Sequence, residues 1–186
     1  QIRNRATIGG NLCSASPIGD LIPALLVLEA KAALTRANGH RILDLQKFIE
    51  GYRKTALTKD EYLSKISLSI PESWSSFAFR KLSKRYEDDI SSVSIAVFLL
   101  HDNVRIKEIR IALGGAGDRA LRLFEVEKII LGRRLIDIDW RAVSDALDRT
   151  IFPISDVRAS ADYRKRMAIA SIKEMVDQFF PSSSGS

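Results

Sequence analysis

The second half of the chain places its strand-like segments before its helix-like segments, and this order constrains the fold more than any other feature. Segments rich in β-branched and aromatic residues lie at residues 77–83, 92–100 and 105–113, and each predicts a strand. The last of them alternates apolar and polar residues, which is typical of a strand with one buried face. Turn residues at 101–103 separate the second strand from the third, so we expect these two to pair antiparallel.

Three predicted helices follow these strands, over residues 121–131, 140–151 and 161–180. Asp139 and Ser160 stand directly before the second and third helices, where their side chains are expected to act as N-caps. Strands and helices that are segregated in the sequence favour an α+β fold. We therefore predict a three-stranded antiparallel sheet packed on a layer of three helices.

The first half of the chain predicts a smaller unit that mixes helices with antiparallel strands. An Asn-Gly pair at 38–39 is a hairpin signal between strands expected at 31–35 and 41–45, and another strand is expected over 62–70. A stretch of Pro, Glu and Ser at 71–76 then interrupts the pattern and predicts a domain boundary. The resulting divisions are residues 1–71, residues 72–181 and a flexible tail at 182–186.

A segment of small and polar residues at 6–20, which we call the glycine segment, predicts a site where a ligand approaches the backbone closely. Gly9 and Gly10 carry no Cβ, so a ligand can reach their N–H groups, and a short helix expected there would add its positive end. The short polar side chains around them are Thr7, Asn11, Ser14 and Ser16. These features suit the pyrophosphate and sugar of a nucleotide, with a simple glycine turn as the alternative.

Composition and charge narrow the function classes further. The 186-residue chain has a formal net charge of +6, which allows an anionic partner. Its basic residues are spread among acidic ones without a long Lys/Arg block, which favours a solvated surface over a nucleic-acid interface. Its longest apolar run is far shorter than a membrane span, and we expect no signal peptide. We therefore expect a cytoplasmic protein without a nucleic-acid or membrane partner, and we interpret the chain as a fragment.

Cysteine and histidine usage argues against a metal centre built by this chain. The single cysteine, Cys13, excludes an intrachain disulfide and the four thiolates of an iron–sulfur cluster, and we expect it to be a small buried hydrophobe. His40 and His101 lie far apart in the sequence, each beside turn residues. Both are interpreted as exposed turn residues, so no metal site is predicted.

The glycine segment resembles the flavin-binding segment of the molybdenum hydroxylase family, which includes xanthine dehydrogenase, aldehyde oxidase and carbon monoxide dehydrogenase. That family carries Thr/Ser-Ile/Leu-Gly-Gly-Asn followed by Ala-Ser-Pro and an Asp, as residues 7–20 do here. The resemblance continues, in the same order, at residues 51–55, 66–71, 81–90 and 160–164. The Ser-Lys-Arg-aromatic-acid-Asp-Asp-Ile run within it looks most like the xanthine dehydrogenase branch.

The resemblance implies a partial FAD-binding lobe followed by the C-terminal domain of the family's flavoprotein. FAD is the cofactor that it implies for this chain, whereas the 2Fe-2S clusters and molybdopterin of the whole enzyme belong to other domains or subunits. In a xanthine dehydrogenase, electrons from purine hydroxylation at the molybdenum centre pass through the clusters to FAD and then to NAD. The implied partners are an iron–sulfur domain, a molybdopterin-binding subunit or domain, NAD, and further copies in a higher-order oligomer.

Carried over residue by residue, the resemblance also implies roles for individual side chains. Those placed at the FAD phosphates and ribose are Thr7, Gly9, Gly10, Asn11, Ser14 and Asp20. Asp20 is in addition predicted as a helix N-cap. Ile66 is implied near the flavin ring, although its strand pattern also fits a core residue.

Lys81 and Asp88 are the catalytic residues that the resemblance implies. Lys81 is placed at the pyrimidine edge of the flavin, where a cation also helps to bind the cofactor and stabilises its reduced form. Asp88 is placed near the flavin face where NAD docks, and Arg85 is expected to hold that loop and the cofactor by pairing with acids. A solvated charge run at a strand end is the alternative for these residues.

Two further segments resemble the family without a functional assignment. Residues 160–164 are interpreted as a capped helix start with a structural role only. The loop at 114–117 resembles a Gly-Gly loop of the family's C-terminal domain, but Asp118 and Arg119 follow it where many relatives have Thr or Pro. Its role therefore stays open.

Two alternatives to a xanthine dehydrogenase flavoprotein remain at this point. The first is the flavoprotein subunit of another molybdenum hydroxylase, of the aldehyde, nicotinate or CO dehydrogenase type. The second is a non-catalytic basic binding module, which the absence of a basic stripe with interleaved aromatic residues disfavours.

Overall fold

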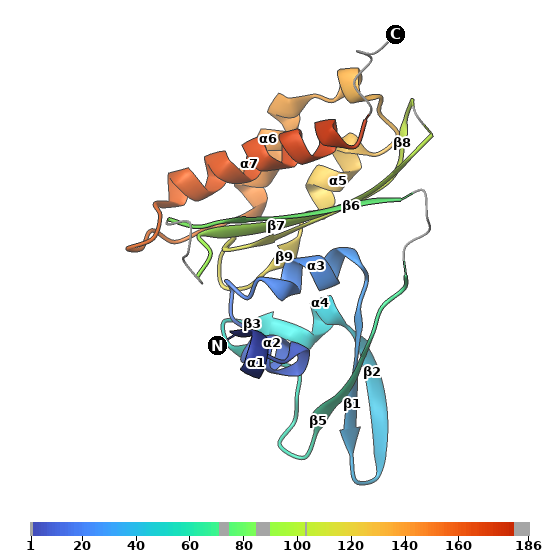
Figure 1. The fold of residues 1–186 in the computed structure, drawn as a ribbon, viewed down its shortest axis with the longest axis vertical. Helices are drawn as coiled ribbons and strands as arrows, with labels where there is room; N and C mark the ends of the chain where they lie inside the picture. The colour runs from blue at the N-terminus through green and yellow to red at the C-terminus, as the bar shows by residue number, and fades with distance from the viewer. Residues whose placement is uncertain (1, 71–74, 85–89, 103, 181–186) are drawn as a thin grey trace.

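The computed structural model describes residues 2–70, 75–84, 90–102 and 104–180, which form two packed units (Figure 1). The elements of the first unit are α1 (Ile2–Arg5), α2 (Ile8–Ser14), α3 (Leu21–Val27), β1 (Lys31–Arg36), β2 (Gly39–Asp44), α4 (Leu45–Phe48), β3 (Ile49–Gly51), β4 (Lys54–Thr55) and β5 (Tyr62–Ser67). Those of the second are β6 (Ser76–Leu82), β7 (Val93–His101), β8 (Ile106–Gly114), β9 (Leu121–Arg122), α5 (Phe124–Ile130), a 3₁₀ turn (Leu135–Asp137), α6 (Trp140–Thr150) and α7 (Ala161–Gln178). The α+β class expected from the sequence is confirmed.

The hairpin predicted in the first unit is confirmed. Strands β1 and β2 pair antiparallel around the Asn-Gly turn, and β5 adds to the other edge of β1 in the order β2-β1-β5. Ala32 and Leu34 alternate into the core of this unit. The predicted domain boundary at 71 and the tail at 182–186 border on or lie outside the described residues, and both stay predictions.

The second unit contains a four-stranded antiparallel sheet in the order β6-β7-β8-β9, so the prediction of three strands was one short. The helix expected from residue 121 begins only at Phe124. Leu121 pairs with Leu113 of β8, and the backbone N–H of Leu123 donates to the carbonyl of Ile111 at 2.8 Å. A strand of two residues has no periodicity of its own, so its apolar residues added to the helical pattern that follows.

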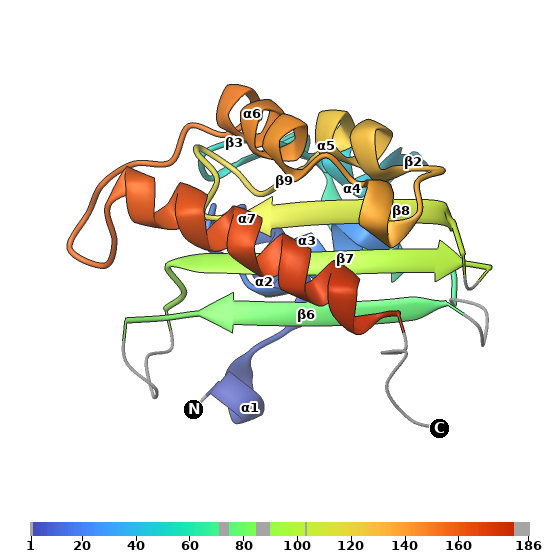
Figure 2. The same ribbon diagram turned by 90° about the horizontal axis from the view of Figure 1, so that it is seen from above.

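Strand β7 is buried on both of its faces. Ile95, Val97 and Leu99 point into the core beneath α5, α6 and α7, which cover one face of the sheet (Figure 2). Ala96 and Phe98 point the other way, into the core that contains α3. The sequence analysis expected helices on one face only. The structure corrects this, because α3 of the first unit covers the second face (Figure 1).

The glycine pair at the end of β8 allows the first unit to approach this second face. The N–H of Gly115 donates to the carbonyl of Pro17 at 2.7 Å. A Cβ at Gly114 would overlap the hydroxyl of Ser94 and lie 3.3 Å from Pro23 of α3. The loop whose role stayed open in the sequence therefore joins the glycine segment to the sheet.

Arginine side chains add polar contacts between the units. Arg110, whose guanidinium lies 4.0 Å from the ring centroid of Phe98, donates to the carbonyl of Val27 at 2.9 Å. Glu29, just after α3, forms ion pairs with both Arg110 and Arg122, at 3.2 and 3.1 Å. The end of α3 is thus fixed to β8 and β9 by charge-assisted hydrogen bonds.

Two expectations for single residues were wrong. Cys13 is exposed rather than buried, because it lies on the outer side of the short helix α2. His101 is the last residue of β7 and stacks on Phe180, with 4.5 Å between ring centroids, so it is not an exposed turn residue. His40 is exposed, as expected, but it lies in β2 rather than in the turn. Within the described ranges, no helix is both long enough and apolar enough to cross a membrane.

Replacing Phe98 by Ala tests the two-sided burial of the sheet. Phe98 is 5% exposed, and a buried Phe→Ala change costs about 3–5 kcal/mol of unfolding free energy. We expect a loss of this size in urea titrations, with tryptophan fluorescence and far-UV circular dichroism shifting together, since both units share the interface. Phe152→Ala is the control, because that side chain is 74% exposed and its loss should cost less than about 0.5 kcal/mol. Equal effects of the two substitutions would contradict the packing described here.

Candidate functional site

A groove of about 760 Å³ lies between the glycine segment and strand β6. Thr7, Ile8 and Asn11 line it from the first unit, and Phe77 and Phe79 line it from the second. Three of these side chains are large, apolar and exposed, at 52% for Ile8, 44% for Phe77 and 40% for Phe79. Exposed apolar surface concentrated in one concave place is typical of a ligand site.

The sheet register explains why these aromatic side chains are left uncovered. Phe77 pairs directly with Phe98 and Phe79 with Ala96, so all four point to the face that α3 covers. Helix α3 packs on β7 and β8, and β6 is the edge strand beyond them. Lys81 follows at the next alternate position of β6 and shares this face. The sequence analysis missed Phe77 and Phe79, although their i, i+2 spacing on one strand was a visible signal.

Thr7 organises the first turn of α2. Its hydroxyl accepts a hydrogen bond from the N–H of Gly10 at 2.9 Å, which makes it the N-cap of this helix. A Cβ on Gly10 would lie 2.9 Å from the same hydroxyl, whereas a Cβ on Gly9 would meet nothing within 4 Å. Gly10 is therefore needed by the helix cap, whereas the backbone at Gly9 is uncovered. Neither glycine lines the groove, although their neighbours Ile8 and Asn11 do.

Asn11 carries a polar atom that a ligand could satisfy. Its Oδ1 is buried and has no hydrogen-bond partner among the described residues, and its side chain lines the groove. A buried acceptor without a donor costs free energy, so a hydroxyl or N–H of a bound molecule would be favourable there. This orphaned oxygen, beside an open glycine and an apolar wall, fits a molecule with both a polar sugar and a flat apolar ring.

Asp20 and Lys81, assigned separately from the sequence, meet at the end of the groove. The Lys81 ammonium lies 2.9 Å from Oδ2 of Asp20, and the Ser91 hydroxyl donates to Oδ1 of the same carboxylate. Asp20 has helical backbone angles and makes no side-chain cap bond, so the prediction that it caps α3 was wrong. Its carboxylate bonds the cation and the hydroxyl instead, and the ammonium supplies a full opposite charge that a cap amide lacks.

The remaining assigned residues lie elsewhere. Ser14 donates from its hydroxyl to the carbonyl of Asn11 at 2.7 Å and does not line the groove. Ile66, half-buried opposite Ala32, packs on the core of the first unit and does not line the groove either. Their places near a flavin stay predictions. Arg85 and Asp88 lie outside the described residues.

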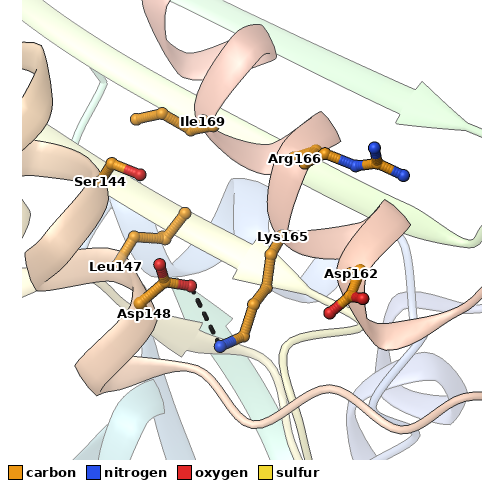
Figure 3. Close-up of a pocket in the computed structure, with 7 residues that line it drawn as sticks. All are labelled: Ser144, Leu147, Asp148, Asp162, Lys165, Arg166 and Ile169. Carbon is orange, nitrogen blue, oxygen red and sulfur yellow. Dashed lines mark ion pairs between the residues drawn. The ribbon is translucent and has the colours of Figure 1, made fainter.

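Other depressions of the surface suit a flavin less well. The cleft between α6 and α7 has about half the volume, near 350 Å³, and charged walls. An ion pair of 3.0 Å between Lys165 and Asp148 crosses it, with Asp162 and Arg166 alongside (Figure 3). Across residues 2–70, 75–84, 90–102 and 104–180, no group of three His, Cys, Asp or Glu side chains is placed to hold a metal ion.

Alanine substitutions at Gly9 and Gly10 test whether the two glycines have different structural roles. Gly10→Ala should displace the Thr7 hydroxyl and remove the cap, which lowers the unfolding free energy by about 1 kcal/mol. Gly9→Ala should leave it unchanged or raise it by up to about 1 kcal/mol, since Ala favours a helix and meets no neighbour. Thermal and urea unfolding of the two variants check this. A larger loss for Gly9→Ala than for Gly10→Ala would contradict the geometry of the cap.

Known families match both units of the chain. Residues 1–72 match the family described as FAD binding domain in molybdopterin dehydrogenase. Residues 78–179 match the family described as CO dehydrogenase flavoprotein C-terminal domain. The first match ends at residue 72 and the second begins at residue 78.

Individual known proteins are similar to this chain over most of its length. The glyceraldehyde dehydrogenase medium chain of Sulfolobus acidocaldarius is 31% identical over 90% of this chain and 59% of its own length. Xanthine dehydrogenase/oxidase of Gallus gallus is 33% identical over 75% of this chain and 10% of its own. The structure of carbon monoxide dehydrogenase from Hydrogenophaga pseudoflava superposes with a TM-score of 0.89 at 29% identity, over 95% of this chain and 61% of that one. The chain thus spans less than two thirds of each of these relatives.

Proposed function

Because the chain belongs to the FAD-subunit family of the molybdenum hydroxylases, we propose that its groove binds FAD and that the whole protein passes electrons through it. The observation that carries this proposal is one groove in which the glycine segment meets the exposed faces of Phe77 and Phe79. Lys81 forms an ion pair with Asp20, which lines this groove. A polar cradle, an apolar wall and a cation are the three surfaces that a flavin dinucleotide needs.

Each part of the groove has a role toward the cofactor. Gly9 would let the pyrophosphate approach the backbone, and Asn11 would take a hydrogen bond from the ribose. Phe77 and Phe79 would cover apolar ring surface and exclude water. When bound, FAD supplies reversible two-electron transfer, and Lys81 would place positive charge where the reduced ring is negative.

The ion pair between Lys81 and Asp20 would determine how strongly the positive charge of Lys81 acts on the flavin ring. At 2.9 Å the carboxylate compensates the ammonium, and both side chains are about one third exposed. The pair is therefore nearly neutral as a unit. Removing Lys81 alone would make the local charge more negative by one elementary charge. Removing Asp20 alone would make it more positive by one.

We further propose that the complete enzyme is of the xanthine dehydrogenase type. Electrons would arrive from a molybdenum centre through 2Fe-2S clusters on other domains or subunits and leave to NAD, with Asp88 and Arg85 on the NAD side. The resemblance of residues 81–90 supports this choice. Relatives named for glyceraldehyde and carbon monoxide match 90% and 95% of this chain, so flavoproteins for other substrates are the alternative.

The FAD content of the assembled, full-length protein tests the main proposal. We expect a flavin absorption spectrum and stoichiometric FAD after denaturation. Gly9→Ala should lower the FAD content although it leaves folding intact, since its added methyl group occupies the open space at the backbone. A colourless protein would contradict FAD binding, and equal FAD retention in Gly9→Ala would contradict the role given to Gly9.

The reduction potential of the bound flavin tests the roles of Lys81 and Asp20. Lys81→Met should lower the two-electron potential by about 20–40 mV, which corresponds to roughly 1–2 kcal/mol less stabilisation of the reduced ring. Asp20→Asn should raise it by a similar amount, because it removes one negative charge beside the ammonium. Spectroelectrochemical titration measures both. Lys84→Met is the control, since Lys84 bonds the carbonyl of Val157 at 3.1 Å and does not line the groove. Shifts of the same sign in Lys81→Met and Asp20→Asn would contradict this assignment.

A further inference from the structure

Arg164, in the first turn of α7, is a buried cation that the proposed function does not use. The residue is only 3% exposed. Burying a guanidinium costs free energy unless it is paired with an acceptor. Its Nη2 lies 2.8 Å from Oδ1 of Asp156, and its Nη1 donates to the backbone carbonyl of Ser92. The sequence analysis gave this segment only a structural role.

Asp156 holds the arginine in place. Its Oδ1 also accepts the N–H groups of Arg158 and Ala159, at 2.9 and 3.1 Å. Partial burial favours the neutral acid, but these amides and the Arg164 guanidinium outweigh it and lower the pKa of the Asp156 carboxyl. The loop before α7 therefore presents Arg164 in a fixed orientation toward the start of β7.

The carbonyl that Arg164 binds lies at a crowded junction. The N–H of Ser92 donates to the carbonyl of Leu82 at 2.7 Å, which ties the start of β7 to the end of β6. Gly115 packs against the same carbonyl with φ +76°, and a Cβ there would lie 3.1 Å from Arg164 Nη1. Gly115 in turn bonds Pro17 of the glycine segment. The arginine thus fixes the point where the glycine segment meets the sheet.

Ser91, next to Ser92, connects this junction to the groove. Its hydroxyl bonds Asp20, whose other carboxylate oxygen pairs with Lys81. Hydrogen bonds and one peptide bond therefore link Asp156 and Arg164 to Asp20 and Lys81.

We infer that Arg164 is a positioning residue for the flavin site. By fixing the Ser92 carbonyl it holds Ser91 against Asp20, and so it sets how far Asp20 compensates Lys81. This inference rests on the proposed function, because it concerns the same groove. It assigns control of the site to the C-terminal helix layer, on the opposite side of the sheet.

The test compares Arg164→Met and Arg164→Lys with a matched control in the assembled protein. Arg80→Met is the control, since Arg80 also ties β6 to α7, through Glu174 at 2.5 Å, on the face away from the groove. We expect Arg164→Met to raise the dissociation constant of FAD about tenfold and to shift the flavin potential, with partial rescue by Arg164→Lys. Arg80→Met should change neither.

A double-substitution cycle distinguishes positioning from general destabilisation. If Arg164 acts through Asp20, the shift in potential caused by Arg164→Met should disappear in the Asp20→Asn background. Asp156→Asn serves where Arg164→Met does not fold, and it should act in the same direction to a smaller extent. Equal effects of Arg164→Met and Arg80→Met, or additive shifts in the cycle, would overturn the inference. A wild-type protein without FAD would instead overturn the proposed function.

Discussion

The burial of β7 on both faces is the constraint on which the rest of the structure depends. A strand whose consecutive residues, such as Val97 and Phe98, are mostly apolar needs cover on each side. The three-helix layer covers one side, and only α3 is available for the other. The groove exists because α3 covers β7 and β8 but not the whole width of the sheet. The helix stops short of the edge strand, so Phe77 and Phe79 stay exposed beside it.

The polar contacts of the site follow from the same arrangement. Where α3 begins, its first residues reach the ends of β6 and β7, and Asp20 meets Lys81 and Ser91 there. The glycine pair after β8 lets the backbone of Pro17 come within hydrogen-bond distance of Gly115. Two backbones can approach this closely only where no side chain lies between them. The resulting hydrogen bond fixes the distance between the glycine segment and the sheet. The candidate site is therefore built by the joining of the units rather than by either unit alone.

Much of this fold could be predicted from the sequence, since strand alternation and helix caps are local signals. The strands β6, β7 and β8 and the cap of α7 by Ser160 agree with prediction, with Ser160 accepting from the N–H of Tyr163. Contacts between distant segments could not be predicted. The apolar positions of β7 revealed a strand but not which element covers each face. The Asp20 carboxylate fitted a local cap equally well, and only the fold brings Lys81 near enough to compete for it.

The core of the first unit is completed by residues from far along the chain, such as Ala96, Phe98 and Ala112. This core therefore cannot be completed before the later segment has been synthesised. Contacts between segments so widely separated close long loops and form slowly. During synthesis the apolar face of α3 stays uncovered until β8 has left the ribosome, and aggregation competes with folding throughout that interval.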